Sequence, residues 1–68
     1  MSISIRVNGD ARQVEEGLTV AALLDALGVK AQRVVVEHNM RILHGEDFAQ
    51  ARIADGDELE VLQFVGGG

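Results

Sequence analysis

Residues 18–29 read LTVAALLDALGV and carry the signals of both ends of a helix. Thr19 can cap the backbone N–H groups of the first turn, and Leu18 and Leu23 are placed to form a hydrophobic staple. Gly28 supplies the left-handed residue that follows a last turn. Apolar residues recur at helical spacing and form one face: Val20, Leu23, Leu24 and Leu27. The stretch therefore predicts a short helix that packs on a sheet.

The residues before this helix predict a β-hairpin. Residues 3–7, ISIRV, alternate apolar and polar side chains, as a strand with one buried face requires. Asn8-Gly9 follows at once, and both residues tolerate positive φ. Residues 11–14 should therefore return antiparallel to the first strand.

The residues after the helix predict two more short strands and a loop. Residues 34–38 are rich in β-branched side chains, and residues 41–43 follow a tight connection at Asn39-Met40. The stretch HGEDFAQAR has no alternation, so it predicts a loop, with one helical turn, that buries Phe48. Ile53 should also point inward.

The last strand decides the topology. Asp55-Gly56-Asp57 predicts a turn, after which ELEVLQF alternates again. Because a helix intervenes after the first hairpin, this strand can enter beside the first strand in parallel. We expect an α+β fold in which one helix crosses one face of a mixed sheet of four or five strands, which is the β-grasp or ubiquitin-like roll. The domain should span residues 1–64, and residues 65–68 should form a flexible glycine-rich tail.

Composition excludes several classes of function. A chain of 68 residues has room for one small core, and without cysteine it has no disulfide or thiolate chemistry. A net charge of −5 and two aromatic residues disfavour nucleic-acid binding. The longest apolar run is far short of the roughly 20 residues that span a bilayer, and no apolar signal segment is visible. We expect a cytoplasmic protein without a membrane or nucleic-acid partner.

Catalytic and metal sites are not predicted. Ser2 and Ser4 lie on an exposed strand face, without the base and orienting group that activate a nucleophile. His38 and His44 flank the short fourth strand, a spacing that more often gives one partly buried and one surface side chain than a metal site. We therefore expect no enzyme, no metal and no bound cofactor.

The C-terminal residues carry the candidate site. If Leu59 and Val61 face the helix, period two puts Leu62 and Phe64 on the opposite face, next to the tail, where they can form a docking surface. Gly66, Gly67 and Gly68 have no side chains, so they could thread a narrow channel, and extended they reach about 10 Å. This pattern suggests a terminal carboxylate that enters a partner's active site.

These features together resemble the ubiquitin-like sulfur carriers, and most closely the ThiS family of thiamin biosynthesis. The resemblance covers the whole chain and rests on VNGDARQV, LTVAALLDALGV, DGDELEV and above all FVGGG. Proteins of this family end in two glycines after an apolar residue, and Gly67-Gly68 occupy those positions. Met40 stands where such proteins often have glycine.

The resemblance implies a carrier whose chemistry is supplied by other proteins. An E1-like adenylating enzyme would use ATP to adenylate the Gly68 carboxylate, and a persulfide sulfur donor would convert it to a thiocarboxylate. A thiazole synthase would then accept the sulfur. Binding to these partners would involve Leu62, Phe64, Val65, Gly66 and Gly67.

Two alternatives share the fold. The small subunit of molybdopterin synthase uses the same terminal thiocarboxylate, but such proteins tend to be longer and to have proline before the glycines, and this chain has no proline. A ubiquitin-like modifier would be joined to substrate lysines by an isopeptide bond. Chain building on such a modifier needs acceptor lysines, and Lys30 is the sole lysine.

Overall fold

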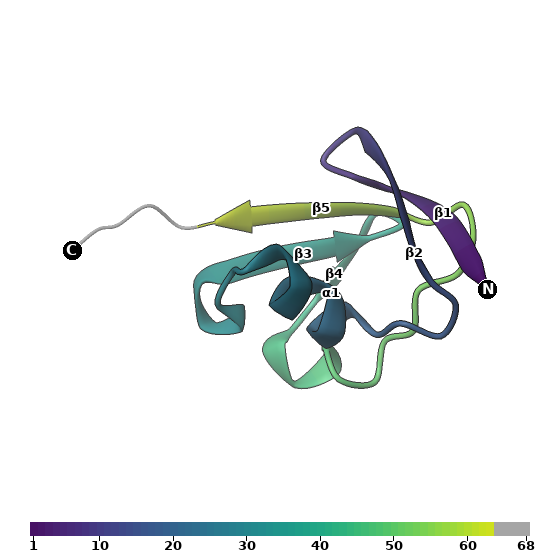
Figure 1. Cartoon of the computed structure of the whole chain (residues 1–68). Coiled ribbons are helices and arrows are strands. Elements are labelled where there is room, and N and C mark those ends of the chain that lie inside the picture. The colour runs from purple at the N-terminus through teal and green to yellow at the C-terminus, as the bar shows by residue number, and fades with distance from the viewer. Residues whose placement is uncertain (64–68) are drawn as a thin grey trace.

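The structure, a computed structural model that describes residues 1–63, is a sheet covered on one face by a helix (Figure 1). In chain order its main elements are β1 (Ser2–Val7), β2 (Asp10–Glu15), α1 (Val20–Leu27), β3 (Val34–His38), β4 (Arg41–Leu43) and β5 (Glu58–Gln63). Two short 3₁₀ helices complete the described chain, η1 (Ala31–Arg33) and η2 (Gly45–Asp47).

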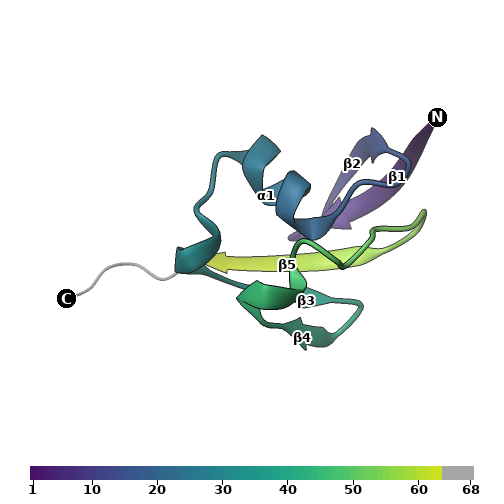
Figure 2. The same ribbon diagram turned by 90° about the horizontal axis from the view of Figure 1, so that it is seen from below.

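The last strand, β5, occupies the centre of the sheet. The strand order is β2-β1-β5-β3-β4, with β5 parallel to β1 and antiparallel to β3. Figure 2 shows the β1–β2 hairpin on one side of β5 and the β3–β4 hairpin on the other. The predicted α+β, β-grasp topology is confirmed, and the sheet has five strands.

Both predicted ends of α1 are present. The Thr19 side chain accepts a hydrogen bond from the Ala22 N–H at 3.2 Å. Gly28 has φ 77°, and the next N–H, of Val29, donates to the Leu24 carbonyl at 3.1 Å. This pattern is a Schellman C-cap, which only a left-handed residue closes without strain.

The loop after β4 satisfies the start of α1. The N–H groups of Val20 and Ala21 donate to the carbonyls of Ala51 and Phe48, each at 2.9 Å. These N–H groups belong to the first turn, so they have no partner within the helix. The loop is thereby fixed against the helix, and Phe48 is 2% exposed, as the sequence predicts.

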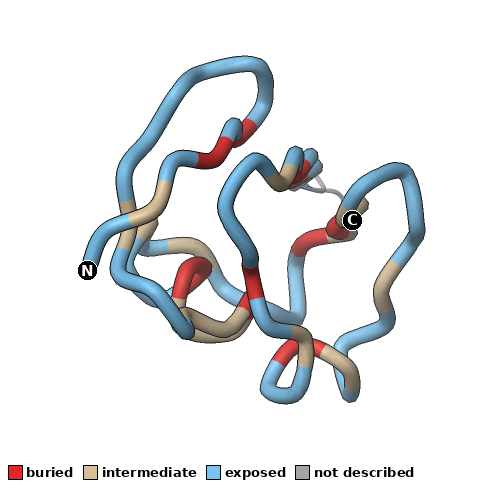
Figure 3. Tube along the Cα trace, turned by 90° about the vertical axis from the view of Figure 1, so that its right-hand side faces the viewer, coloured by how far each residue is buried: buried red, intermediate tan, exposed pale blue. Residues whose placement is uncertain are grey.

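The core lies between α1 and the inner face of the sheet. Buried segments face one another across this space in the tube of Figure 3, and the hairpin turns are exposed. The buried residues are Ile5, Val7, Val20, Leu23, Leu24, Val34, Val36, Phe48, Ile53, Leu59 and Val61. The inward residues predicted for the helix and for the first and last strands belong to this set or, like Leu27 and Ile3, pack against it half-buried.

Two tight turns join the strand pairs, and both use left-handed backbone at successive positions. Asn8 and Gly9 have φ 52° and 85°, and Asn39 and Met40 have φ 51° and 69°. Positive φ at both central residues is typical of a type I′ turn, whose twist matches that of the flanking strands. The connection at Asn39-Met40 therefore forms as predicted, with a methionine where glycine is favoured.

Candidate functional site

The outer face of β5 is the described part of the predicted docking surface. Leu59 is 1% and Val61 9% exposed on the helix side, whereas Leu62 is 50% exposed on the opposite side. The alternation predicted for this strand is therefore confirmed as far as Gln63. The other predicted site residues lie outside the described residues: Phe64, Val65, Gly66, Gly67 and Gly68.

The neighbours of β5 extend this outer face into a mixed apolar and acidic surface. Leu62 lies opposite Val35 of β3, and Glu60 lies opposite Glu37. Ile42 of β4 lies opposite Glu37 on the other side of β3, and its side chain is 58% exposed. We call Leu62, Val35, Ile42, Glu37 and Glu60 the outer patch.

The outer patch combines large apolar side chains with unneutralised charge. Within residues 1–63 the ion pair formed is between His38 and Asp57, so neither Glu37 nor Glu60 is neutralised there by a neighbouring cation. Like charges directly opposite on adjacent strands are destabilising. The patch thus suits a partner surface that is apolar at its centre and basic around it.

Asn8, the first residue of the β1–β2 turn, holds the middle of β5. Its Oδ1 accepts the Val61 N–H at 2.7 Å and its Nδ2 donates to the Val61 carbonyl at 3.2 Å. The register between β1 and β5 covers Arg6 with Glu58 and Val7 with Leu59. The Asn8 side chain therefore continues the pairing of β5 where the backbone of β1 turns away.

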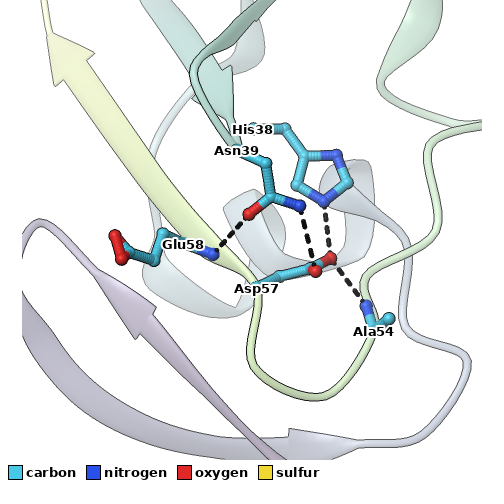
Figure 4. Close-up of polar contacts among 5 residues, drawn as sticks. All are labelled: His38, Asn39, Ala54, Asp57 and Glu58. Atoms are coloured by element: carbon cyan, nitrogen blue, oxygen red, sulfur yellow. Dashed lines mark hydrogen bonds and ion pairs between the residues drawn. The ribbon is translucent and has the colours of Figure 1, made fainter.

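Asn39, the first residue of the β3–β4 turn, holds the start of β5. Its backbone N–H donates to the Glu58 carbonyl at 2.8 Å, and its Oδ1 accepts the Glu58 N–H at 2.9 Å. Its Nδ2 donates to Oδ1 of Asp57 at 3.0 Å (Figure 4). The two hairpin turns on either side of the sheet centre thus each contribute an asparagine to β5.

Asp57 accepts hydrogen bonds from three residues. Besides Asn39, its carboxylate accepts the Ala54 N–H at 2.8 Å and lies 2.6 Å from Nε2 of His38 (Figure 4). Burial raises the pKa of Asp57, but hydrogen bonds from Ala54, His38 and Asn39 lower the pKa by a larger amount. The pKa of Asp57 therefore lies below its ordinary value of 3.8. The cluster fixes where β5 begins.

A groove lies on the helix side of β5, at the end where the described chain stops. It has a volume of about 340 Å³. Its apolar lining includes Leu27, Val29 and Val61, and its polar lining includes Asn8, Arg12 and Gln63. It is therefore on the opposite side of β5 from the outer patch.

The histidines serve local structure. His38 is half-buried and pairs with Asp57, whereas His44 is exposed, with its backbone N–H donating to Asp47 at 3.0 Å. Among residues 1–63 no group of three or more His, Asp or Glu side chains is placed to hold a metal ion. No helix of the described chain is long and apolar enough to cross a bilayer.

Sequence reasoning missed the asparagine contacts, the Asp57 cluster and the groove. Asn8 and Asn39 were informative in the sequence only as residues that tolerate positive φ. Each asparagine is the first of two left-handed residues in a turn. Its presence in the sequence therefore predicts the turn, but it does not predict which strand the carboxamide contacts. That contact exists only because β5 inserts between the two hairpins.

Comparison with known proteins identifies the family. The sequence profile of the ThiS family matches residues 5–68. A crystal structure of the thiamine biosynthesis protein ThiS from Geobacter metallireducens has a TM-score of 0.83 and 42% identity, and covers 97% of this chain and 100% of that one. The sulfur carrier protein ThiS of Bacillus subtilis is 31% identical over 65 residues, which are 94% of this chain and 98% of that protein.

A larger protein also contains a similar sequence. A thiazole synthase from Paramagnetospirillum magneticum is 44% identical over 62 residues, which are 91% of this chain. The chain spans only 19% of the length of that synthase. The profile match and the similarity to ThiS proteins along nearly their full length decide the assignment, and this chain belongs to the ThiS family.

Proposed function

We propose that this protein is a sulfur carrier of thiamin biosynthesis, and that Gly68 is its reactive C-terminal residue. The carboxylate of Gly68 is adenylated by an E1-like enzyme, converted to a thiocarboxylate, and used as the sulfur source by a thiazole synthase. The protein itself is a co-substrate and not an enzyme.

The observation that carries this proposal is the position of β5. It is the central strand, flanked by β1 and β3 and held by Asn8 and Asn39, and the next residues in the sequence are Phe-Val-Gly-Gly-Gly. A rigid strand gives a defined starting point for a glycine segment that has to enter an active site. Membership of the ThiS family supports the same conclusion.

The chemistry follows from the inertness of a carboxylate. The Gly68 carboxylate attacks the α-phosphate of ATP, which releases pyrophosphate and makes AMP a leaving group. The terminal sulfur of a persulfide then attacks the carbonyl carbon and expels AMP. The product is an acyl disulfide between Gly68 and the donor. A thiol reduces its sulfur–sulfur bond, which leaves the thiocarboxylate on Gly68 and a disulfide between donor and thiol. The sulfur can reside only at this carbonyl in a chain without cysteine.

Partner recognition is assigned to the outer patch and the residues that follow it. Leu62 is half-exposed without being required by the core, and Glu37 and Glu60 lie opposite each other on the same face. Phe64 and Val65 continue the sequence from this strand. Similarity to a segment of a thiazole synthase favours a thiazole synthase as the sulfur acceptor.

The experiment is intact-mass spectrometry after incubation with ATP, the adenylating enzyme of the same organism, a persulfide donor and a thiol. We expect the mass gain that replaces one oxygen by sulfur, located on Gly68 by fragmentation, and dependent on ATP. A variant that lacks Gly67 and Gly68 is the control and should gain nothing.

The same experiment separates the alternatives. A product joined to lysine with no sulfur-bearing intermediate would replace the carrier by a ubiquitin-like modifier. A thiocarboxylate whose sulfur passes to a molybdopterin precursor, and not to the product of a thiazole synthase, would assign the chain to the molybdopterin pathway.

A further inference from the structure

Within residues 1–63, the C-terminal end of β5 has one backbone edge that no other strand covers. The N–H and C=O of Val61 face the β1 side of the strand, where Asn8 binds them. Residues two apart in a strand direct these groups to the same side, so the N–H and C=O of Gln63 also face the β1 side. The last β1 residue, Val7, pairs with Leu59, four positions before Gln63. No residue of the described chain pairs with Gln63 on this side.

The other edge of β5 is occupied at the same position. Gln63 lies opposite Val34, in the last register position of β3 with β5. The strand is therefore held in extended conformation on one side, while its opposite side has no partner among residues 1–63. An ordered, unpaired strand edge is a template for another extended chain.

The groove lies directly beside this open edge. Leu27, the last residue of α1, and Val29, just after its C-cap, line it together with Gln63. Both apolar side chains are half-buried and pack against the core, so they form a fixed wall. An extended segment that pairs with Gln63 directs alternate side chains toward this wall.

The short distance along the chain from Gln63 to Gly68 limits how far from this edge an enzyme that acts on Gly68 can bind. Five residues, 64–68, follow Gln63. Fully extended at about 3.3–3.6 Å per residue, they reach roughly 17 Å. An enzyme that holds Gly68 in its active site must therefore bring the entrance of that site close to the Gln63 edge.

We propose that the groove and the open edge of Gln63 receive an extended main-chain segment of the adenylating enzyme, which pairs with β5 and places an apolar side chain against Leu27 and Val29. The inference rests on the proposed function and names a second contact, on the helix side of β5. The enzyme thereby contacts β5 on both faces, through the groove on the helix side and through the outer patch on the opposite side. The two contacts together align the residues that lead to Gly68.

The test uses two substitutions at one position. Gln63→Pro removes the N–H that faces the β1 side of the strand. Proline is tolerated in a strand at a position whose N–H makes no hydrogen bond within the sheet. Gln63→Ala removes the side chain and keeps the N–H. Both variants lack the glutamine side chain and differ in the N–H, so we expect Gln63→Pro to bind the adenylating enzyme about tenfold more weakly than Gln63→Ala, because recognition is by main chain. Equal affinities of the two variants would overturn the inference.

A second pair of variants examines the apolar wall. Val29→Thr adds a hydroxyl inside the groove, and Val14→Thr makes the same change at a half-buried position outside it. We expect Val29→Thr to weaken binding about five- to tenfold and Val14→Thr to leave it unchanged, because the hydroxyl loses water only in the complex formed by the first variant. Equal effects, measured on proteins shown to be folded, would contradict the proposal.

Hydrogen exchange gives a measurement without substitution. In the free protein the Gln63 amide should exchange faster than the Val61 amide, which Asn8 protects. In the complex it should become protected, and a Gln63 amide that stays unprotected would exclude main-chain pairing. Failure of wild-type thiocarboxylation would refute the proposed function itself, whereas normal thiocarboxylation without these effects would refute only the groove contact.

Discussion

The carboxamide of Asn8 hydrogen-bonds both backbone groups of Val61, a residue 53 positions later in the chain. Because Asn8 has φ 52°, its backbone turns away from β5 while its side chain remains against it. One residue therefore closes the first hairpin and holds the central strand. The contact holds β5 at Val61, two residues before the strand ends at Gln63.

Replacing Asn8 by glycine should separate these two tasks. Asn8→Gly keeps the positive φ of the turn and removes both hydrogen bonds to Val61. We expect the free energy of unfolding to fall by about 1–3 kcal/mol, since each bond contributes roughly 0.5–1.5 kcal/mol. Urea unfolding measures the change. A variant as stable as the wild type would show that water replaces the carboxamide without loss.

Met40 should be replaceable by glycine with a gain in stability. Its φ of 69° is left-handed and its side chain is 92% exposed, so the substitution relieves strain and loses no packing. We expect a gain of about 0.5–1 kcal/mol, because left-handed backbone costs a non-glycine residue about 1–2 kcal/mol and added chain entropy offsets part of the relief. Thermal unfolding checks it.

The reciprocal change in the other turn is the matched control. A Cβ added at Gly9 meets no atom within 4 Å, but the residue has φ 85°. Gly9→Ala should therefore lower the free energy of unfolding by about 1 kcal/mol through backbone strain alone. Met40→Gly should raise the free energy of unfolding and Gly9→Ala should lower it. Changes in the same direction would contradict the assignment of backbone strain.

The Asp57 cluster should make stability depend on acid pH. The folded pKa of Asp57 lies below 3.8, so the ionised carboxylate stabilises the fold at higher pH, and this contribution is lost as the pH falls through the folded pKa. Asp57→Asn should lower the free energy of unfolding at pH 7 by about 1.5–3 kcal/mol, the range for hydrogen bonds to a charged group. The deficit should shrink below pH 3.8.

Asp25→Asn provides the comparison for Asp57, because Asp25 is exposed on α1. Its substitution should change stability by less than about 0.5 kcal/mol, as is usual for surface positions. Denaturant unfolding at a series of pH values measures both variants. A deficit for Asp57→Asn that stays constant with pH would show that the carboxylate charge is not what stabilises the cluster.

Leu62 should contribute to binding more than to folding. Leu62→Ala removes a side chain that is 50% exposed on the outer patch, so stability should fall by no more than about 1 kcal/mol. Affinity for the adenylating enzyme should fall about tenfold, since a well-placed apolar contact at an interface centre costs about 1–2 kcal/mol on truncation. Calorimetric titration beside thermal unfolding measures the two effects.

Met40→Ala is the control for Leu62, because Met40 is also an exposed large apolar residue but lies in the β3–β4 turn. This turn is next to the start of β5, at the opposite end from Gln63. Binding of Met40→Ala should match that of the wild type. Equal losses for both variants would mean that exposed apolar area in general, and not the outer patch, drives association.

Gly67, which lies outside the described residues, is predicted to require the absence of a side chain. Gly67→Ala should leave the unfolding temperature unchanged and slow adenylation at least about tenfold, because a methyl group clashes in a channel that admits only backbone. Pyrophosphate release with the adenylating enzyme measures the rate. An unchanged rate would remove the steric argument.

The sequence by itself determined the elements and their faces. Periods of two and of about 3.6 residues, the caps at Thr19 and Gly28, and the asparagines at both turns are local signals, because each depends on residues a few positions apart. The same local logic placed Phe48 and Ile53 inside and Leu62 outside, as the structure confirms. The glycine segment and its role in sulfur transfer were likewise predicted from sequence, through resemblance to a family.

Only the tertiary structure decided what surrounds β5. Asn8 reaches Val61, and Asn39 and His38 reach Asp57, because β5 inserts between two hairpins formed much earlier in the chain. These contacts join residues 18 to 53 positions apart, and no periodicity encodes a distance between such residues. The groove arises in the same way. Its walls come from the β1–β2 hairpin, the end of α1 with the residues just after it, and β5, which approach one another only when apolar burial brings the layers together.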